Sequence, residues 1–344
     1  MSSGRIDALA ERTLDGWGRV GLVVGTIARG ETTVRGYGRV RIEHEELPRH
    51  DTIFEIGSIT KIFTVLALVD MVEDGLLSLD DPVDDHLPSA LRVPAHEGRR
   101  ITLRDLATHT SAFPRAPRGI ARQALRERRN PYAKFSLDDL ATGLRQTKLK
   151  RSPGAKFGYS NLGGGLLGLA LAERTGTTYE ELIRDRVCAP LGLDDTAIAV
   201  PAEKRARLAQ GHTRLRRPVP PFEIPVLAGA GALRSTADDM LRFLQAGLGE
   251  GDTRLPRELV AMQGPRVRVG RRIAAGLGWM LEPLGGTGHR IAWHNGGTIG
   301  FRSFAGLVRE TGTAVIVLSN TGRSVDLLGL RILEELDRSA SRGL

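Results

Sequence analysis

The stretch Ser58-Ile59-Thr60-Lys61 lies where a short predicted strand, residues 52–56, runs into a helix that is apolar nearly all round, residues 62–72. Two side chains three positions apart on a helix share one face, so the hydroxyl and the amine are expected to lie together. A helix that is apolar all round is typical of a protein core. Ser58 is therefore expected at a helix N-terminus and Lys61 one buried turn inside.

This placement favours a nucleophile with its base. Backbone N–H groups at a helix N-terminus stabilise a developing oxyanion, and burial weakens the proton affinity of an amine. Lysine is scarce here, with six among 49 basic residues, and arginine does not release its proton in a protein. The alternative interpretation is structural: Ser58 caps the helix and Lys61 reaches toward solvent.

Composition indicates a globular protein. The 344 residues are 41% hydrophobic and are expected to bury a large core. The net charge of +9 comes from basic residues interleaved with acids, so we expect no nucleic-acid partner and interpret Arg214–Arg217 as a solvated loop. No apolar run has the length of a membrane span, so no membrane contact is expected.

Cys188 and the N-terminus bear on the compartment. Cys188 is the single cysteine of the sequence, so no internal disulfide forms, and its apolar setting predicts a packed position. Residues 1–12 read as an amphipathic helix rather than a signal peptide. We therefore expect a cytoplasmic protein.

Patterns along the chain predict an α/β fold. Two strands near the start and two near the end are joined by hairpin turns, and an amphipathic helix follows the last strand. The middle carries helical periodicity. We predict an antiparallel β-sheet flanked by N- and C-terminal helices, with a mostly helical domain inserted. Residues 1–80 and 205–344 would form the α/β sandwich, residues 81–204 the helical domain, and their interface the active site.

Three further segments carry polar side chains. Tyr159 and Asn161 precede a glycine-rich helix and are expected to point the same way. His294 ends a predicted strand that runs into Gly296 and Gly297, where backbone can approach a ligand. His109 follows a short helix and is either a general base or, as we favour, a structural hydrogen-bonding residue.

Taken in order, the motifs S-x-x-K, Y-x-N and H-x-G resemble those of the serine β-lactamase and penicillin-binding-protein superfamily. The resemblance is greatest to the branch of class C β-lactamases, D-Ala-D-Ala carboxypeptidases, D-aminopeptidases and related esterases. It extends over nearly the whole chain and implies a β-lactamase/transpeptidase-like fold.

The resemblance implies a role for each motif residue. Ser58 would be the acylated nucleophile, and Lys61 and Tyr159 would act together as the general base. Which of the two accepts the proton of Ser58 is left open. Asn161 would hold the acyl side chain or Lys61. The backbone N–H groups of Ser58 and Gly297 would form the oxyanion hole.

Substrate binding is assigned to His294 and Gly296 of the third motif and to Arg302. Many β-lactamases have a lysine where this chain has His294, and a histidine is only partly charged near neutral pH. Recognition of a substrate carboxylate is therefore in question. Arg302 either restores it by facing the substrate or is a surface residue. No cofactor is implied, and the sequence has no cluster of metal-binding residues.

The expected activity is that of a metal-independent serine hydrolase cleaving a small ester, amide or peptide through an acyl-enzyme. One alternative is acyl transfer from the same intermediate. Others are penicillin binding, β-lactamase or D-Ala-D-Ala carboxypeptidase activity, and a sensor that is acylated without turnover. The sequence does not indicate the oligomeric state.

Overall fold

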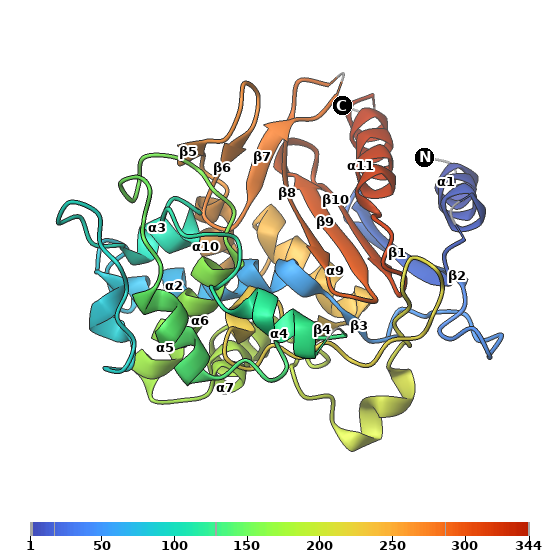
Figure 1. The fold of residues 1–344 in the computed structure, drawn as a ribbon. Helices are drawn as coiled ribbons and strands as arrows, with labels where there is room; N and C mark the ends of the chain where they lie inside the picture. Colours follow the sequence, from blue (N-terminus) through green and yellow to red (C-terminus); the bar gives the residue numbers. More distant parts are fainter. Residues whose placement is uncertain (1–2, 17, 128, 286, 343–344) are drawn as a thin grey trace.

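The computed structural model of the chain describes residues 3–16, 18–127, 129–285 and 287–342. Its centre is an eight-stranded sheet in which every neighbouring pair is antiparallel (Figure 1). In spatial order the strands are β2 (Glu31–Gly38), β1 (Gly21–Ala28), β10 (Thr313–Ser319), β9 (Arg302–Val308), β8 (Arg290–Gly297), β7 (Met280–Pro283), β6 (Ala274–Ala275) and β5 (Val267–Arg268).

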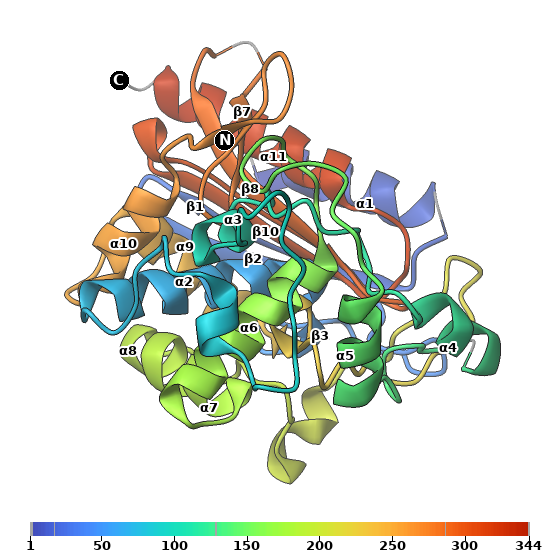
Figure 2. The same cartoon turned by 60° about the vertical axis from the view of Figure 1, so that its left-hand side comes forward.

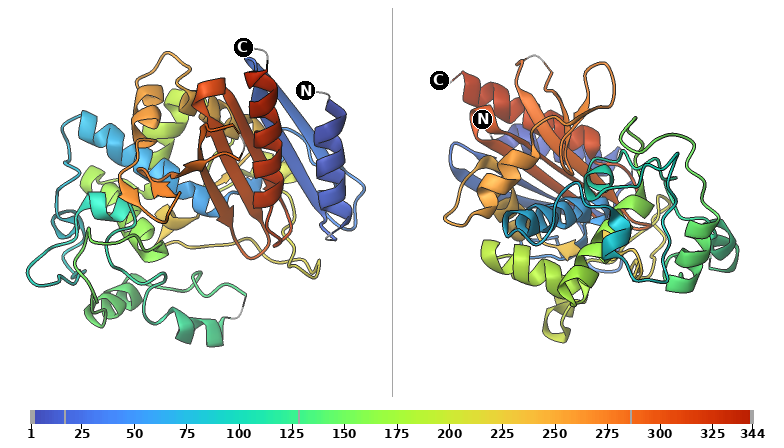
Figure 3. Two further views of the ribbon diagram at one scale, coloured as in Figure 1. Left: turned by 90° about the horizontal axis from the view of Figure 1, so that it is seen from above. Right: turned by 90° about the vertical axis from the view of Figure 1, so that its left-hand side faces the viewer.

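Helices cover both faces of this sheet. The terminal helices α1 (Ser3–Asp15) and α11 (Asp326–Ser341) run side by side over one face (Figure 3). On the other face lie α2 (Thr60–Glu73), α9 (Ala237–Leu248) and α10 (Leu255–Met262). Strand β10 is buried along its whole length because alternate side chains enter the two apolar clusters on either side. The predicted sheet with terminal helices is thus confirmed.

The N-terminal helix and both hairpins form where the sequence placed them. Residues 1 and 2 of the predicted first helix lie outside the described part of the chain. Cys188 is buried, as predicted, and burial raises the pKa of its thiol to about 12. None of the described helices is both long and apolar enough to cross a membrane.

The stretch around Ser58 differs from expectation in one detail. Gly57–Ile59 form a turn of 3-10 helix, η1, and α2 begins at Thr60. Neither helix start has a side-chain cap, so the interpretation of Ser58 as a capping residue is wrong. Before η1, the strand β3 (Phe54–Glu55) pairs with β4 (Arg234–Ser235) in a second, two-stranded sheet rather than joining the main one.

The middle of the chain is mostly helical, as predicted. The proposed division into residues 1–80 with 205–344 and residues 81–204 stays a prediction, since α2 of the first part packs against α6 and α7 of the second (Figure 2). The helices of this region are α3 (Leu103–Ala107), α4 (Ile120–Arg126), α5 (Leu137–Arg145), α6 (Asn161–Thr175), α7 (Tyr179–Ile183) and α8 (Ala189–Leu191).

The glycines of α6 permit a close approach to α2. A Cβ atom at Gly164 would lie 2.9 Å from Cε of Lys61, and one at Gly168 would lie 2.8 Å from the Cα atom of Gly229. The second contact brings α6 against the short 3-10 helix η5 (Ala228–Ala230). Glycine is needed at both positions because a side chain at Gly164 would displace that of Lys61, and one at Gly168 would push α6 away from η5.

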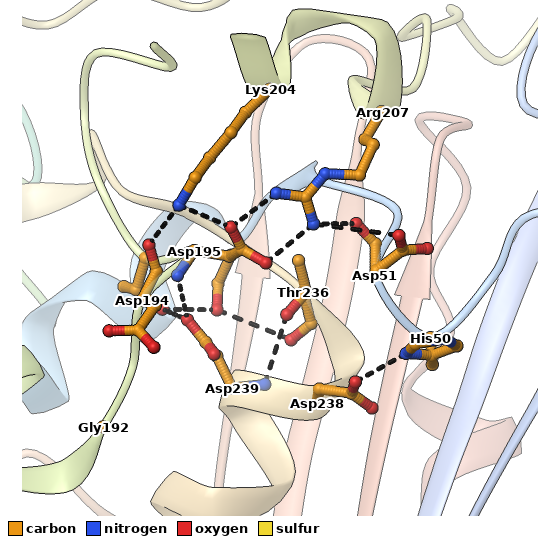
Figure 4. A network of polar contacts seen from close by, with 12 residues as sticks. His50, Asp51, Gly192, Asp194, Asp195, Lys204, Arg207, Thr236, Asp238 and Asp239 are labelled. Carbon is orange, nitrogen blue, oxygen red and sulfur yellow. Dashed lines mark hydrogen bonds and ion pairs between the residues drawn. The ribbon is translucent and has the colours of Figure 1, made fainter.

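A polar network joins the end of the helical region to the start of α9 (Figure 4). Arg207 donates two hydrogen bonds, of 2.7 and 2.6 Å, to the carboxylate of Asp195, and Lys204 lies 2.8 Å from the same carboxylate. The backbone N–H of Asp195 donates to Asp239 in the first turn of α9 at 2.8 Å. These bonds hold residues 194–207 against the first turn of α9.

Candidate active site

Ser58 and Lys61 face each other, as their spacing predicted. Nζ of Lys61 lies 3.1 Å from Oγ of Ser58. Ser58 is partly exposed, whereas Lys61 is only 2% exposed. Burial is the largest influence on the Lys61 amine and lowers its pKa, and the charge of Arg115 lowers it further. The pair therefore combines an accessible hydroxyl with an amine that releases its proton readily.

The other partners of Lys61 fix the direction of its lone pair. Nζ donates to Oδ1 of Asn161 at 3.0 Å and to the backbone oxygen of Ala230 at 2.6 Å. Both oxygens can only accept, so a neutral amine donates one hydrogen bond to each of them with its two N–H groups. The remaining lone pair then points toward Ser58, whose hydroxyl can donate. Asn161 thus contacts Lys61, one of the two roles that the resemblance implied.

The ring of Tyr159 packs beside the Lys61 amine. Nζ of Lys61 is 5.0 Å from the centre of the tyrosine ring, and the electrostatic interaction with Tyr159 raises the amine's pKa against the larger effect of burial. The imidazole of His109 packs on the same ring with 4.5 Å between ring centres. Two segments far apart in sequence thus meet at one amine.

His109 supports Tyr159 rather than acting as a base. Its Nδ1 accepts a hydrogen bond from the backbone of Ser160 at 3.3 Å, and its carbonyl accepts one from Gly158 at 2.7 Å. Its backbone adopts φ of +57°, which is uncommon for a residue with a side chain. Burial keeps the pKa of its imidazole well below the ordinary value. These features agree with the structural role that we favoured.

Backbone geometry places Gly297 beside the nucleophile. Thr298 donates its N–H to Phe301 across the turn between β8 and β9, at 3.1 Å. Because donors alternate along an antiparallel strand, the N–H of the preceding Gly297 points away from β9. A Cβ atom at Gly57 would lie 2.5 Å from that nitrogen, so Gly297 adjoins the residue before Ser58. The two predicted oxyanion donors are thus close neighbours.

Gly296 is held in contact with η1. A Cβ atom there would lie 1.9 Å from the carbonyl oxygen of Ile56 and 2.3 Å from the hydroxyl of Ser303. That hydroxyl donates to the same carbonyl at 2.8 Å. Gly296 therefore sets the separation of β8 from the nucleophile, and its role in substrate binding stays a prediction.

His294 is buried beside the reacting groups and carries no charge at neutral pH. Its ring centre is 6.1 Å from that of Tyr159, and its Nδ1 lies 2.6 Å from the carbonyl oxygen of Asn295. Burial first, and the charge of Lys61 second, lower the pKa of His294 to about 4. A partial charge near neutral pH was expected, so the structure makes this position less cationic than the sequence suggested.

Arg302 is turned into its own loop. Its Nη1 donates to the carbonyl oxygen of Phe301 at 2.6 Å and also to that of Thr298. On β9, Arg302 alternates with Ser303, which bonds toward η1, so the two side chains leave opposite faces of the strand. A role in binding a substrate carboxylate stays a prediction that these contacts do not favour.

Two contributors were missed by sequence reasoning. Arg115 lies with its guanidinium carbon 5.1 Å from the centre of the Tyr159 ring, and its carbonyl accepts the N–H of Asn161 at 2.8 Å. The carbonyl of Ala230 holds Lys61. An arginine among so many gives no signal in the sequence, and a backbone oxygen gives none at all.

The depressed pKa of His294 predicts acid sensitivity. The unfolded chain binds this proton near pH 6.5, while the folded chain binds it near pH 4, so stability falls as the pH drops between these values. From pH 7 to pH 5 the loss from this residue is about 2 kcal/mol. Urea denaturation at both pH values is expected to show a smaller acid loss in His294→Gln. The exposed His44→Gln serves as control, and an equal reduction there would contradict the assignment.

Comparisons with known proteins extend over nearly the whole chain. The Beta-lactamase family profile matches residues 6–336. The D-alanyl-D-alanine-carboxypeptidase/endopeptidase AmpH of Escherichia coli (strain K12) is 30% identical over 337 residues, covering 92% of this chain and 84% of that protein.

Solved structures give the same result. A class C beta lactamase from Rhodobacter sphaeroides has a TM-score of 0.82 at 26% identity, covering 99% of this chain and 100% of that one. The Beta-lactamase/D-alanine carboxypeptidase from Yersinia pestis, complexed with citrate, has a TM-score of 0.79 at 27% identity, covering 98% and 97%. The matches include every segment that meets around Ser58.

Proposed function

The chain belongs to the β-lactamase family of metal-independent serine hydrolases, and from that premise we propose that it cleaves esters or amides through an acyl-enzyme on Ser58. One observation supports this most: a buried amine with a lowered pKa lies 3.1 Å from the hydroxyl of Ser58. The proposal includes esterase activity and a cytoplasmic place of action.

Acylation begins with Ser58. Its Oγ attacks the carbonyl carbon of the substrate while its proton passes to Nζ of Lys61, whose lone pair faces it. The carbonyl oxygen becomes an oxyanion and accepts hydrogen bonds from the backbone N–H groups of Ser58 and Gly297. One such donor is worth about 3 kcal/mol in comparable hydrolases.

Collapse of the tetrahedral intermediate breaks the bond to the leaving group. The leaving oxygen or nitrogen takes a proton from the phenol of Tyr159, and the proton held by Lys61 then replaces it on the phenol, the ring of which has its centre 5.0 Å from Nζ. Water then attacks the acyl carbon, gives its proton to the same pair, and Ser58 is released. Neutral His294 packs beside this relay and adds no competing charge.

The charges around the site bear on the substrate. At the β8 wall, His294 is uncharged at neutral pH and Arg302 is bound to its own loop. The exposed Arg115 lies on the Asn161 side. We therefore favour substrates whose leaving group lacks a carboxylate, namely esters and amides rather than peptides with a free C-terminus.

A matched pair of peptides tests this preference. The tripeptide diacetyl-Lys-D-Ala-D-Ala and its C-terminal amide differ only in the terminal charge. We expect kcat/KM for the amide to equal or exceed that for the acid, and a p-nitrophenyl ester to be turned over steadily. Initial rates at pH 7.5 provide the measurement.

The outcomes separate the alternatives. A preference for the acid of more than about tenfold, equal to ~1.4 kcal/mol, would show that a cation serves the leaving-group carboxylate. A single burst without turnover on every substrate would identify a sensor. Faster product formation with added alcohol or amine would identify an acyltransferase.

A further inference from the structure

A second site lies on the opposite face of the sheet from Ser58. A cavity of about 500 Å³ opens between the end of α1, the start of α11 and the loop around residue 214. Such a volume is typical of pockets for small molecules. Five arginines line it, from segments far apart in sequence: Arg12, Arg19, Arg214, Arg323 and Arg331.

The charge of this cavity is not compensated within the described part of the chain. None of the five arginines makes an ion pair there, whereas Arg186, Arg207 and Arg254 each pair with a carboxylate elsewhere in the described structure. The carboxylate at the start of α11, Asp326, accepts instead from the side chain of Asn295 at 2.8 Å. The backbone N–H groups at the start of α11 add to the positive potential.

Arg19 forms the buried floor of the cavity. It is 8% exposed and bridges α1 to the loop before α11 by donating to the carbonyls of Thr13, at 2.6 Å, and Ser324. Its Nε is buried and has no hydrogen-bond partner among the described residues. Burial, and then the charge of Arg323, lower the pKa of Arg19 to about 10. An anion in the cavity would relieve the repulsion between Arg19 and Arg323.

The walls also carry apolar surface. Leu9, Leu327 and Leu328 line the same cavity, and Leu327 is 61% exposed. Guanidinium groups match phosphate oxygens in pairs, and several uncompensated cations favour a ligand with several negative charges. We propose that this cavity binds an organic polyphosphate of nucleotide size, with its phosphates on the arginines and its apolar part on the leucines.

Arg12 and Arg331 are suited to mutation. Both are exposed, and the described structure gives their side chains no hydrogen bond or ion pair. The test variant is Arg12→Gln with Arg331→Gln. The matched control is Arg174→Gln with Arg257→Gln, which removes the same charge from two exposed positions on α6 and α10.

Calorimetric titration at constant ionic strength with EDTA uses ATP, tripolyphosphate and adenosine as probes. We expect ATP to bind the wild type and the control within about twofold, and the test variant at least about tenfold more weakly. Tripolyphosphate should bind more weakly than ATP, and adenosine should not bind. ATP should raise the melting temperature of the wild type.

Several results would overturn the proposal. Equal weakening of ATP binding in both double variants would indicate a nonspecific charge effect. An absence of binding at millimolar ATP would show that the cavity does not take an organic polyphosphate. If the protein bound vesicles containing phosphatidylglycerol but not ATP, the arginines would serve a membrane surface rather than a soluble ligand. Hydrolysis of a p-nitrophenyl ester is expected to be unchanged in both variants, so the result is independent of the reaction at Ser58.

Discussion

Ser58→Ala is expected to lower kcat by at least about four orders of magnitude while leaving the fold intact. The reason is that the hydroxyl is the attacking atom, and no other group near Lys61 replaces it. Its hydroxyl lies 3.1 Å from Nζ of Lys61, and it caps neither helix start. The free energy of unfolding should therefore change by less than about 1 kcal/mol.

Ser136→Ala gives the reverse pattern and serves as the control. Ser136 caps α5, accepting the N–H of Asp139 in a complete capping box. Its loss should cost about 1 kcal/mol of stability and leave kcat unchanged. Measuring both kcat and urea denaturation for the two variants separates a chemical from a structural serine. A collapse of stability in Ser58→Ala would argue for a structural role.

Lys61→Arg is expected to lower kcat by about three orders of magnitude or more. Arginine keeps the positive charge but has no lone pair for the Ser58 proton at any accessible pH. The larger side chain also presses on Gly164, where even a Cβ atom would lie 2.9 Å from Lys61. Lys61→Met, which keeps an unbranched side chain but has no proton-accepting amine, distinguishes the two causes and should be equally inactive.

Lys134→Arg is the matched control because Lys134 is exposed. It should retain wild-type activity. For the wild type, kcat/KM should rise with pH as Lys61 loses its proton, since the neutral amine is the active form. Near-normal turnover by Lys61→Arg would remove the amine from the mechanism, and Tyr159 alone would then have to serve as base.

Local spacing was enough to predict the contact of Ser58 with Lys61. Both residues lie within one helical turn, and the apolar sequence of the helix that follows indicates that Lys61 is buried. The meeting of Lys61 with Tyr159 and His294 depends on long-range packing, which no local pattern encodes. Those residues were predicted because their ordered motifs resemble a known family, not from periodicity.

Other features depend on tertiary structure alone. The charge state of His294 follows from its burial, at 4% exposure, beside Lys61, and strand patterns do not indicate how deeply one residue is buried. Arg302 was assigned to the substrate from its position, but the turn between β8 and β9 offers it carbonyls within reach.

The arginine-lined cavity shows the same limit. Arg214 was interpreted as part of a solvated loop because its neighbours in sequence are basic and polar. In the folded chain it lies with Arg19 and Arg323, which are far from it in sequence. Uncompensated charge becomes visible only once the ends of α1 and α11 are brought together.

The central claim is that Ser58 is the residue that carries the acyl group. Intact-protein and peptide mass spectrometry after reaction with a fluorophosphonate tests this most directly. We predict one adduct per chain on the peptide that contains Ser58, present in Ser136→Ala and absent in Ser58→Ala. An adduct on a different residue, or full ester hydrolysis by unlabelled Ser58→Ala, would contradict it.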